Sequence, residues 1–64
     1  MTMKYKNGMR IELDSGSVIR INRQNYKYRI AGYDRDLNLL PIKTYKTLDG
    51  VKKYMLKTYG IVLE

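Results

Sequence analysis

Arginine, lysine and tyrosine are the residues of this sequence whose side chains offer the most chemistry. Thirteen Lys and Arg residues stand against six Asp and Glu residues, which gives a formal net charge of +7 over 64 residues. The aromatic residues are seven Tyr, with no Phe or Trp. Cationic side chains neutralise phosphates, and aromatic rings offer stacking surfaces for bases. This composition favours an anionic partner, nucleic acid above all; the plainer alternative is a charged surface that only keeps the protein soluble.

The basic residues and tyrosines fall in phase along several short alternating segments. Successive residues of a strand point to opposite faces of a sheet. One face then displays the candidate nucleic-acid-binding residues Arg10, Arg20, Lys27, Arg29, Tyr33, Lys43 and Tyr45. The neighbouring polar residues Asn22, Gln24 and Asn25 are suited to hydrogen bonds with base edges or phosphates. The alternative is an ordinary solvated face, which any sheet covered by helices on one side possesses.

Catalysis is not expected of this composition, and neither is a cofactor. The sequence has no His and no Cys, which removes the commonest general base and the best nucleophile, and its six acids are dispersed. Asp34-x-Asp36-x-Asn38 resembles the opening of a calcium loop, but Leu39 stands where that loop needs Gly and Tyr45 where it needs Glu. We therefore predict a turn at residues 34–38 and no metal site.

Four strands must position the basic face, and hydrophobic alternation with period two predicts them over residues 9–14, 18–23, 26–33 and 39–45. Residues 14–17, Asp-Ser-Gly-Ser, predict a hairpin turn; a phosphate-binding loop is the less favoured alternative. Gly32 indicates a bulge or a close backbone approach, and Pro41 indicates an edge strand or one that starts late. On the face opposite the cations we expect Tyr26, Tyr28 and Leu40 with the strand core residues Ile11, Ile19, Ile21, Ile30 and Ile42.

The hydrophobic period changes to 3.6 near Thr47, which predicts a helix over residues 47–59. Thr47 suits the N-cap and Gly60 the left-handed C-cap. Val51 and Met55 complete the predicted core, Leu48, Leu56 and Tyr59 share their side, and Lys53 and Lys57 face away. Residues 61–63 are expected to close the core or add a short strand, and residues 1–7 to form an extra strand or a loose arm.

These elements predict an α+β fold with the order β-β-β-β-α, in which a small antiparallel sheet carries one C-terminal helix on one face. The length allows a single small domain over residues 1–64. The absence of Cys fits a cytoplasmic, intracellular protein. No hydrophobic run is long enough to span a bilayer, so no membrane partner is expected; a basic amphipathic helix lying on a membrane is the less favoured alternative.

Residues 26–34, followed by Lys43-Thr44-Tyr45-Lys46-Thr47 before the helix, resemble the AP2-like N-terminal DNA-binding domain of tyrosine integrases. That family has a three-stranded sheet followed by a helix and lays the sheet in the DNA major groove. The resemblance, which covers about half of the chain, implies that Lys27, Arg29 and Lys43 face DNA. Two features depart from it: Gly50-Val51 replaces a frequent Glu-Ala, and the hairpin over residues 9–23 is additional.

Two functional hypotheses follow. The first is a non-enzymatic nucleic-acid-binding module that uses the basic, Tyr-containing sheet face, with DNA favoured over RNA. The alternative is a small inhibitor or adaptor of the phage or mobile-element type, which binds a larger protein or nucleoprotein machine. The sequence leaves the oligomeric state open, a homodimer included.

Overall fold

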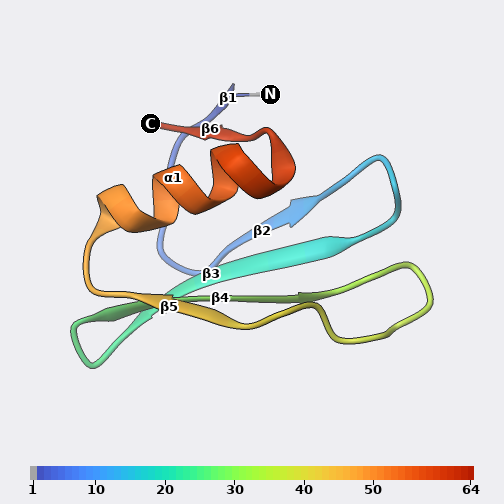
Figure 1. Cartoon of the computed structure of the whole chain (residues 1–64), viewed down its shortest axis with the longest axis horizontal. Helices are drawn as coiled ribbons and strands as arrows, with labels where there is room; N and C mark the ends of the chain where they lie inside the picture. Colours follow the sequence, from blue (N-terminus) through green and yellow to red (C-terminus); the bar gives the residue numbers. More distant parts are fainter. Residues whose placement is uncertain (1) are drawn as a thin grey trace.

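A four-stranded antiparallel sheet lies under one helix in the computed structural model, which describes residues 2–64 (Figure 1). The strand order in this sheet is β2-β3-β4-β5, and α1 packs against β4 and β5. A second sheet pairs β1 with β6 in parallel. The predicted α+β class is confirmed. The elements are β1 (Thr2–Met3), β2 (Met9–Glu12), β3 (Val18–Gln24), β4 (Lys27–Tyr33), β5 (Lys43–Tyr45), α1 (Leu48–Tyr59) and β6 (Val62–Leu63).

The register of the central strands follows from their alternation. Ile11 lies opposite Ile19, and Ile21 lies opposite Ile30, so the isoleucines gather on the face that α1 covers. A register slip of one residue would turn every one of them toward solvent, so burial of this face fixes the pairing. In β2, β3 and β4 the isoleucines therefore face the helix and the residues between them face away from it, as the sequence predicts.

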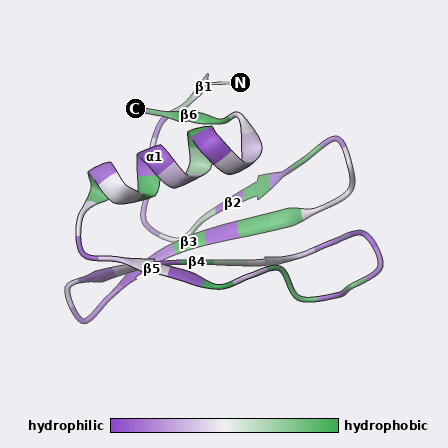
Figure 2. Ribbon diagram, viewed as in Figure 1, coloured by the Kyte–Doolittle hydropathy of each residue, from purple (hydrophilic) through white to green (hydrophobic). Residues whose placement is uncertain are grey.

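The core contains six of the seven predicted residues and two from the C-terminal segment. Ile42 is the exception, because half of its surface (50%) is exposed. Ile61 and Leu63 are buried instead, and Val62 and Leu63 form β6, so residues 61–63 both close the core and add a short strand. The buried hydrophobic residues are Ile11, Ile19, Ile21, Ile30, Val51, Met55, Ile61 and Leu63. Figure 2 shows the hydrophobic colour on β6 and a hydrophilic turn between β3 and β4.

The helix begins and ends at the predicted caps. The Thr47 hydroxyl accepts a hydrogen bond from the Gly50 N–H at 3.2 Å, which satisfies one free donor of the first turn. Gly60 adopts the left-handed conformation at φ 68°, and its N–H donates to the Leu56 carbonyl. Leu56 itself is 55% exposed, so its assignment to the packed side of the helix was wrong. Residues 2–64 contain no helix long and apolar enough to cross a membrane.

Strand β5 is shorter than predicted, and its faces are reversed. Pro41 and Ile42 lie outside the ladder, and the strand begins at Lys43. Lys43 pairs with Ile30, and Tyr45 pairs with Tyr28, so both lie on the helix side of the sheet. The irregular residues shift the alternation by one position, because Pro41 cannot donate a ladder hydrogen bond. Ile42 consequently faces the outer side instead of the core.

The turn between β3 and β4 contains Asn25 and Tyr26, one residue later than the connection at Gln24 and Asn25 that the predicted strands leave. Gln24 pairs with Lys27 across this two-residue turn. Asn25 and Tyr26 have φ values of 51° and 64°, the left-handed region that a tight hairpin of this type requires. Tyr26 therefore does not join Tyr28 and Ile30 on the inner face; it is 85% exposed.

The remaining turns follow the local chemistry of Asp, Ser and Gly. The Asp34 carboxylate accepts hydrogen bonds from the backbone N–H groups of Asp36 and Asn38, each at 2.9 Å. The pKa of Asp34 is lowered, chiefly by the Asn38 N–H. The predicted turn at residues 34–38 is thus confirmed. The 14–17 hairpin turn is confirmed as well, with a hydrogen bond from the Leu13 N–H to the Ser17 carbonyl.

The N-terminal segment forms an extra strand, one of its two predicted outcomes. Thr2 pairs with Val62, and Met3 pairs with Leu63, so β1 fixes the strand that follows the helix. Tyr5 then packs against the core, with its ring in edge contact with Tyr28 at a centroid distance of 6.0 Å. Both ends of the described chain are therefore held together.

Candidate nucleic-acid interface

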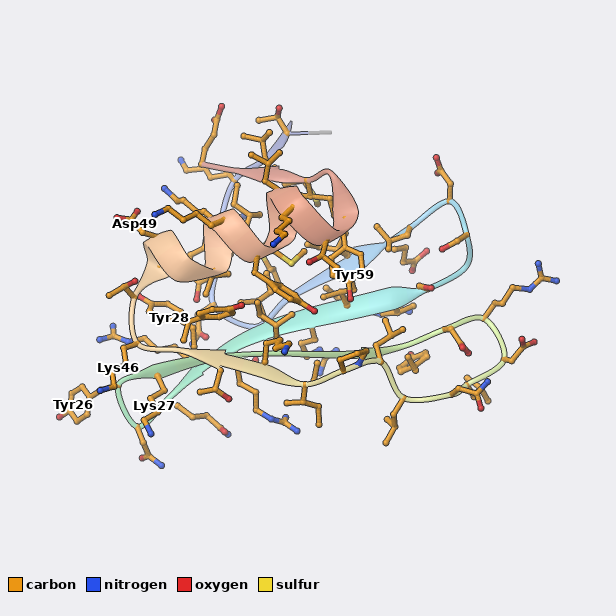
Figure 3. The ribbon with its side chains drawn as sticks, viewed as in Figure 1. Tyr26, Lys27, Tyr28, Lys46, Asp49 and Tyr59 are labelled. Atoms are coloured by element: carbon orange, nitrogen blue, oxygen red, sulfur yellow. The ribbon has the colours of Figure 1, made fainter. Side chains whose placement is uncertain are left out.

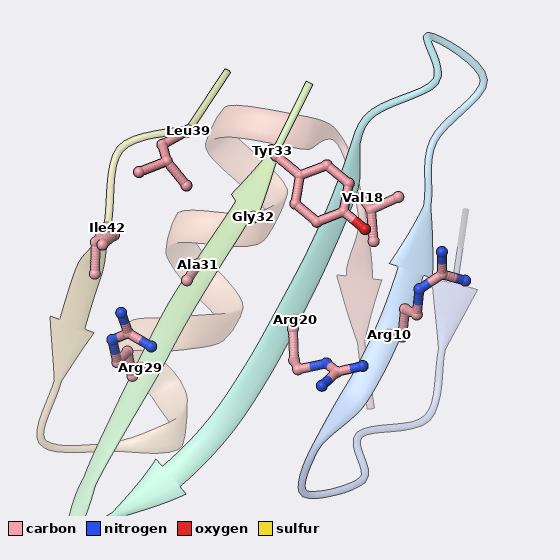
Figure 4. Close-up of a pocket in the computed structure, with 9 residues that line it drawn as sticks. All are labelled: Arg10, Val18, Arg20, Arg29, Ala31, Gly32, Tyr33, Leu39 and Ile42. Atoms are coloured by element: carbon pink, nitrogen blue, oxygen red, sulfur yellow. The ribbon is translucent and has the colours of Figure 1, made fainter. Parts of the chain in front are cut away.

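The sheet face that α1 does not cover carries the cations at matching positions of neighbouring strands. Arg10 lies directly opposite Arg20, and Arg20 lies opposite Ala31. Arg29 lies two residues before Ala31 on β4 and pairs with Asn22. Residues that pair across an antiparallel ladder share a face, so the three arginines project from one surface. We call this surface the outer face (Figure 4).

A shallow hollow of about 430 Å³ lies on the outer face. Guanidinium groups occupy one part of its wall, and hydrophobic side chains occupy the other. Tyr33 lies in the hydrophobic part, between Leu39 and Val18, with 38% of its surface exposed (Figure 4). The lining residues are Arg10, Val18, Arg20, Arg29, Ala31, Gly32, Tyr33, Leu39 and Ile42.

The charge of this face is only partly compensated. Arg10 forms an ion pair with Glu12, two residues along β2. The pKa of the Arg10 guanidinium is raised, first by its hydrogen bond to Glu12 and then by the Tyr33 hydroxyl. Within residues 2–64 this is the only side-chain ion pair closer than 4.0 Å, so Arg20 and Arg29 have no carboxylate partner there. Their charge is available to an anion.

Five of the seven predicted site residues lie on the outer face. Lys27 and Arg29 alternate along β4 with Tyr33, and Arg10 and Arg20 come from β2 and β3. Lys43 and Tyr45 do not join them, because the shifted alternation of β5 turns both to the helix side. Thr44 takes the position beside Arg29 instead.

Lys43 and Tyr45 form a second, separate groove between β5 and α1, with a volume of about 420 Å³. The rings of Tyr45 and Tyr54 are in tilted contact at 5.8 Å. The charge of Lys43 lies beside those of Lys53 and Lys57 on the helix. The sequence had instead predicted Lys43 on the sheet face away from the helix and the two helix lysines on the other side of the molecule. A Cβ at Gly50 would lie 2.8 Å from the Tyr45 ring, so this glycine allows the helix to approach β5.

The hydrophobic part of the hollow was not predicted as part of the site. Val18 lies on the outer face because it pairs with Tyr33 across β3 and β4. Leu39 reaches the hollow through an isolated bridge to Tyr33, and Ile42 through the break at Pro41. No periodic signal in the sequence marks either residue, because both depend on an irregular backbone segment.

The arrangement is suited to binding an anion that carries an apolar or aromatic group. Guanidinium groups form strong charge-assisted hydrogen bonds with phosphate oxygens and also lie flat on planar rings. The described residues 2–64 contain no group of three or more His, Cys, Asp or Glu side chains placed to hold a metal ion.

Comparisons of the chain with protein-family models, with curated proteins and with solved structures gave no match. The resemblance to the AP2-like integrase domain therefore stays a prediction.

Proposed function

We propose that this protein is a non-enzymatic nucleic-acid-binding module whose outer face contacts the sugar–phosphate backbone and bases. The observation that carries the proposal is the direct opposition of Arg10 and Arg20, with Arg29 nearby, around one hollow. Like charges placed directly opposite each other destabilise a sheet. A phosphate-bearing partner would convert this repulsion into attraction.

The outer face supplies the contacts that such a partner needs. Arg20 and Arg29 have no carboxylate partner within residues 2–64, so a phosphate would meet an uncompensated charge. Tyr33 offers an aromatic ring beside them, and Leu39 and Ile42 offer apolar contact for a sugar or base. Phosphate contacts would position the nucleic acid on the outer face. We favour DNA over RNA as the partner only because of the resemblance to the integrase domain.

Salt dependence tests the electrostatic part of the proposal. Lys27 and the three outer-face arginines make four cations in phase, since Lys43 lies on the other side. About three to four phosphate contacts predict a log–log salt slope of roughly −3 to −4 for duplex DNA. The titration should compare short single- and double-stranded DNA and RNA at equal length.

Paired double variants locate the surface. Replacing both Arg20 and Arg29 with Ala should flatten the salt slope by about two, because two phosphate contacts are lost. Replacing both Lys53 and Lys57 with Ala removes the same charge from the groove between β5 and α1, and should change the slope much less. Absence of binding at low salt, or a larger effect of the lysine pair, would reject the outer face as the interface.

A second function, an adaptor or inhibitor that binds a larger protein, is favoured by exposed apolar side chains. Leu37 and Leu39 are 76% and 80% exposed, and Ile42 lies beside Leu39 on the hollow. An apolar protein interface would survive high salt and heparin, whereas phosphate-driven binding would not. Nuclease treatment before co-purification separates the two, because only a protein partner stays bound after it.

A further inference from the structure

Tyr26 has a backbone conformation that its residue type does not favour. It occupies the second position of the two-residue β3–β4 turn at φ 64°, directly after Asn25 at φ 51°. Glycine is the preferred residue at this position of such a hairpin, because a side chain is strained there. The chain tolerates this strain at the tip of its longest paired hairpin.

Packing gives no reason for a tyrosine at this position. The ring is 85% exposed, the most exposed of the large hydrophobic and aromatic residues in the part of the chain that the structure describes. Tyr26 is absent from the residues that pack against the core, whereas Tyr28, two positions later, belongs to them. Figure 3 shows Tyr26 at the outermost end of the hairpin, away from the helix.

Cations lie at the same end of the molecule as this exposed ring (Figure 3). Lys27 follows it directly, and Figure 3 shows Lys46 at the same end of the molecule. Lys27 and Arg29 continue from the tip along the outer face in two-residue steps, about 7 Å apart at the rise of an antiparallel strand. A polyanion that follows the outer-face cations thus reaches the tip beside Tyr26.

We infer that Tyr26 is a stacking platform for an unpaired nucleobase, so that the module binds single-stranded nucleic acid in preference to duplex. The inference rests on the proposed function and adds the class of substrate. A base inside a duplex is already stacked on both faces. A side chain inserted between two such bases must break their stacking, at a cost of a few kcal/mol per step. An unpaired base offers a free face to a ring that is already exposed at a tight turn.

Substitutions at Tyr26 test the inference through affinity and stability together. Stacking of one base on one ring contributes about 1–3 kcal/mol, so Tyr26→Ala should weaken binding of an oligo-dT by roughly 5- to 150-fold. Binding of a blunt duplex of the same length should change less than about 2-fold, and Tyr26→Phe should keep the affinity for oligo-dT, since the ring remains. Equal losses on oligo-dT and duplex, or no loss on oligo-dT, would overturn the inference.

Tyr26→Gly separates a binding role from a structural one. Glycine adopts the left-handed conformation without strain, so this variant should unfold at a higher temperature than the wild type. It should nevertheless lose the same affinity for oligo-dT as Tyr26→Ala. A residue kept for stability could not produce that combination; a lower unfolding temperature together with full binding would refute the stacking role.

A fluorescent variant reports stacking directly. The sequence contains no Trp, so Tyr26→Trp introduces a single indole whose emission oligo-dT should quench on binding. Unchanged emission in the bound state would contradict base stacking at the tip. If the wild type binds neither oligo-dT nor duplex, the proposed function fails and this inference with it. If binding depends on Arg20 and Arg29 but not on Tyr26, this inference alone fails.

Discussion

Arg10 of β2 and Arg20 of β3 lie directly opposite each other on the outer face, and only Arg10 has a carboxylate partner in the described chain. The sheet therefore carries a repulsion that folding does not need. Isoleucine pairs on the other face hold the same strands in register, so the repulsion is tolerated. A site that binds an anion is expected to keep such a pair of opposed like charges, since the same two arginines attract a phosphate.

Removing one of these charges should stabilise the free protein. Arg20→Gln is expected to raise the free energy of unfolding by about 0.2–1 kcal/mol at low ionic strength, the usual size of a cross-strand pair. The gain should shrink as added salt screens the charges. Denaturant unfolding at two salt concentrations measures both effects.

Lys6→Gln is the control for this experiment, because it lowers the net charge equally at an exposed position outside the sheet and outside the groove of Lys43, Lys53 and Lys57. It should give a smaller gain than Arg20→Gln. Equal gains would mean that net charge, and not the opposed pair, sets the effect.

Ile21 and Ile42 offer a matched test of the two sheet faces. Ile21 is fully buried, so Ile21→Ala should lower the free energy of unfolding by about 2–5 kcal/mol. Ile42 is 50% exposed on the outer face, so Ile42→Ala should cost less than about 1 kcal/mol. Thermal or urea unfolding of both variants tests the register of β5. A large loss of stability in Ile42→Ala would mean that Ile42 is buried, as the sequence predicted.

The sequence was sufficient for β2, β3 and β4 because their alternation is uninterrupted. Each buried isoleucine there fixes the direction in which its neighbours point. Arg20 and Arg29, which stand next to buried isoleucines, must therefore lie on the outer face. The helix was equally predictable, since Thr47 and Gly60 carry recognisable capping chemistry.

Apart from Leu56 on the helix, the errors lie where backbone irregularity overrides alternation. Two residues outside the ladder at Pro41 and Ile42 reverse every later side chain of β5, and no periodic pattern marks such a shift. Tyr26 was misplaced for a related reason. Tyrosine gives no sign of a left-handed turn, so Asn25 alone was too weak a signal for the tight hairpin.

Gly32 should not tolerate a side chain. A Cβ built there would lie 2.1 Å from the Val18 carbonyl oxygen on β3, so the predicted close backbone approach is present. Gly32→Ala is expected to cost about 1–3 kcal/mol or more, because backbone on both strands must move. Gly60→Ala meets no atom within 4 Å and loses only its left-handed preference, about 1–2 kcal/mol. Urea unfolding of the two variants should rank Gly32→Ala as the more damaging; the reverse order would contradict the close packing of β3 on β4.

Tyr5 should be replaceable by phenylalanine without loss. Its hydroxyl is buried and makes no hydrogen bond within residues 2–64, and burial is the main cause of its raised pKa. Tyr5→Phe keeps the edge contact with Tyr28 and removes an unsatisfied polar atom, so stability should stay equal or rise by about 1 kcal/mol. Tyr26→Phe, at a residue that is 85% exposed, is the control and should change nothing. A loss above about 1 kcal/mol at Tyr5 would show that its hydroxyl has a partner.

Tyr59 should make stability fall at high pH. Its pKa is raised to about 12, first by burial and then by its hydrogen bond to Tyr54. The ionised form is disfavoured in the folded protein relative to the unfolded chain, where tyrosine titrates near pH 10. The stabilising contribution is therefore complete below pH 10 and is lost as the pH rises toward 12.

The difference between wild type and Tyr59→Phe isolates this effect from the lysines, which titrate in the same range. The variant keeps the ring that contacts Tyr54 at 6.0 Å, so its fold should persist. Between pH 10 and 12 its unfolding temperature should fall less steeply than that of the wild type. Parallel curves would mean that the Tyr59 hydroxyl ionises equally in both states, and that neither burial nor Tyr54 protects its proton.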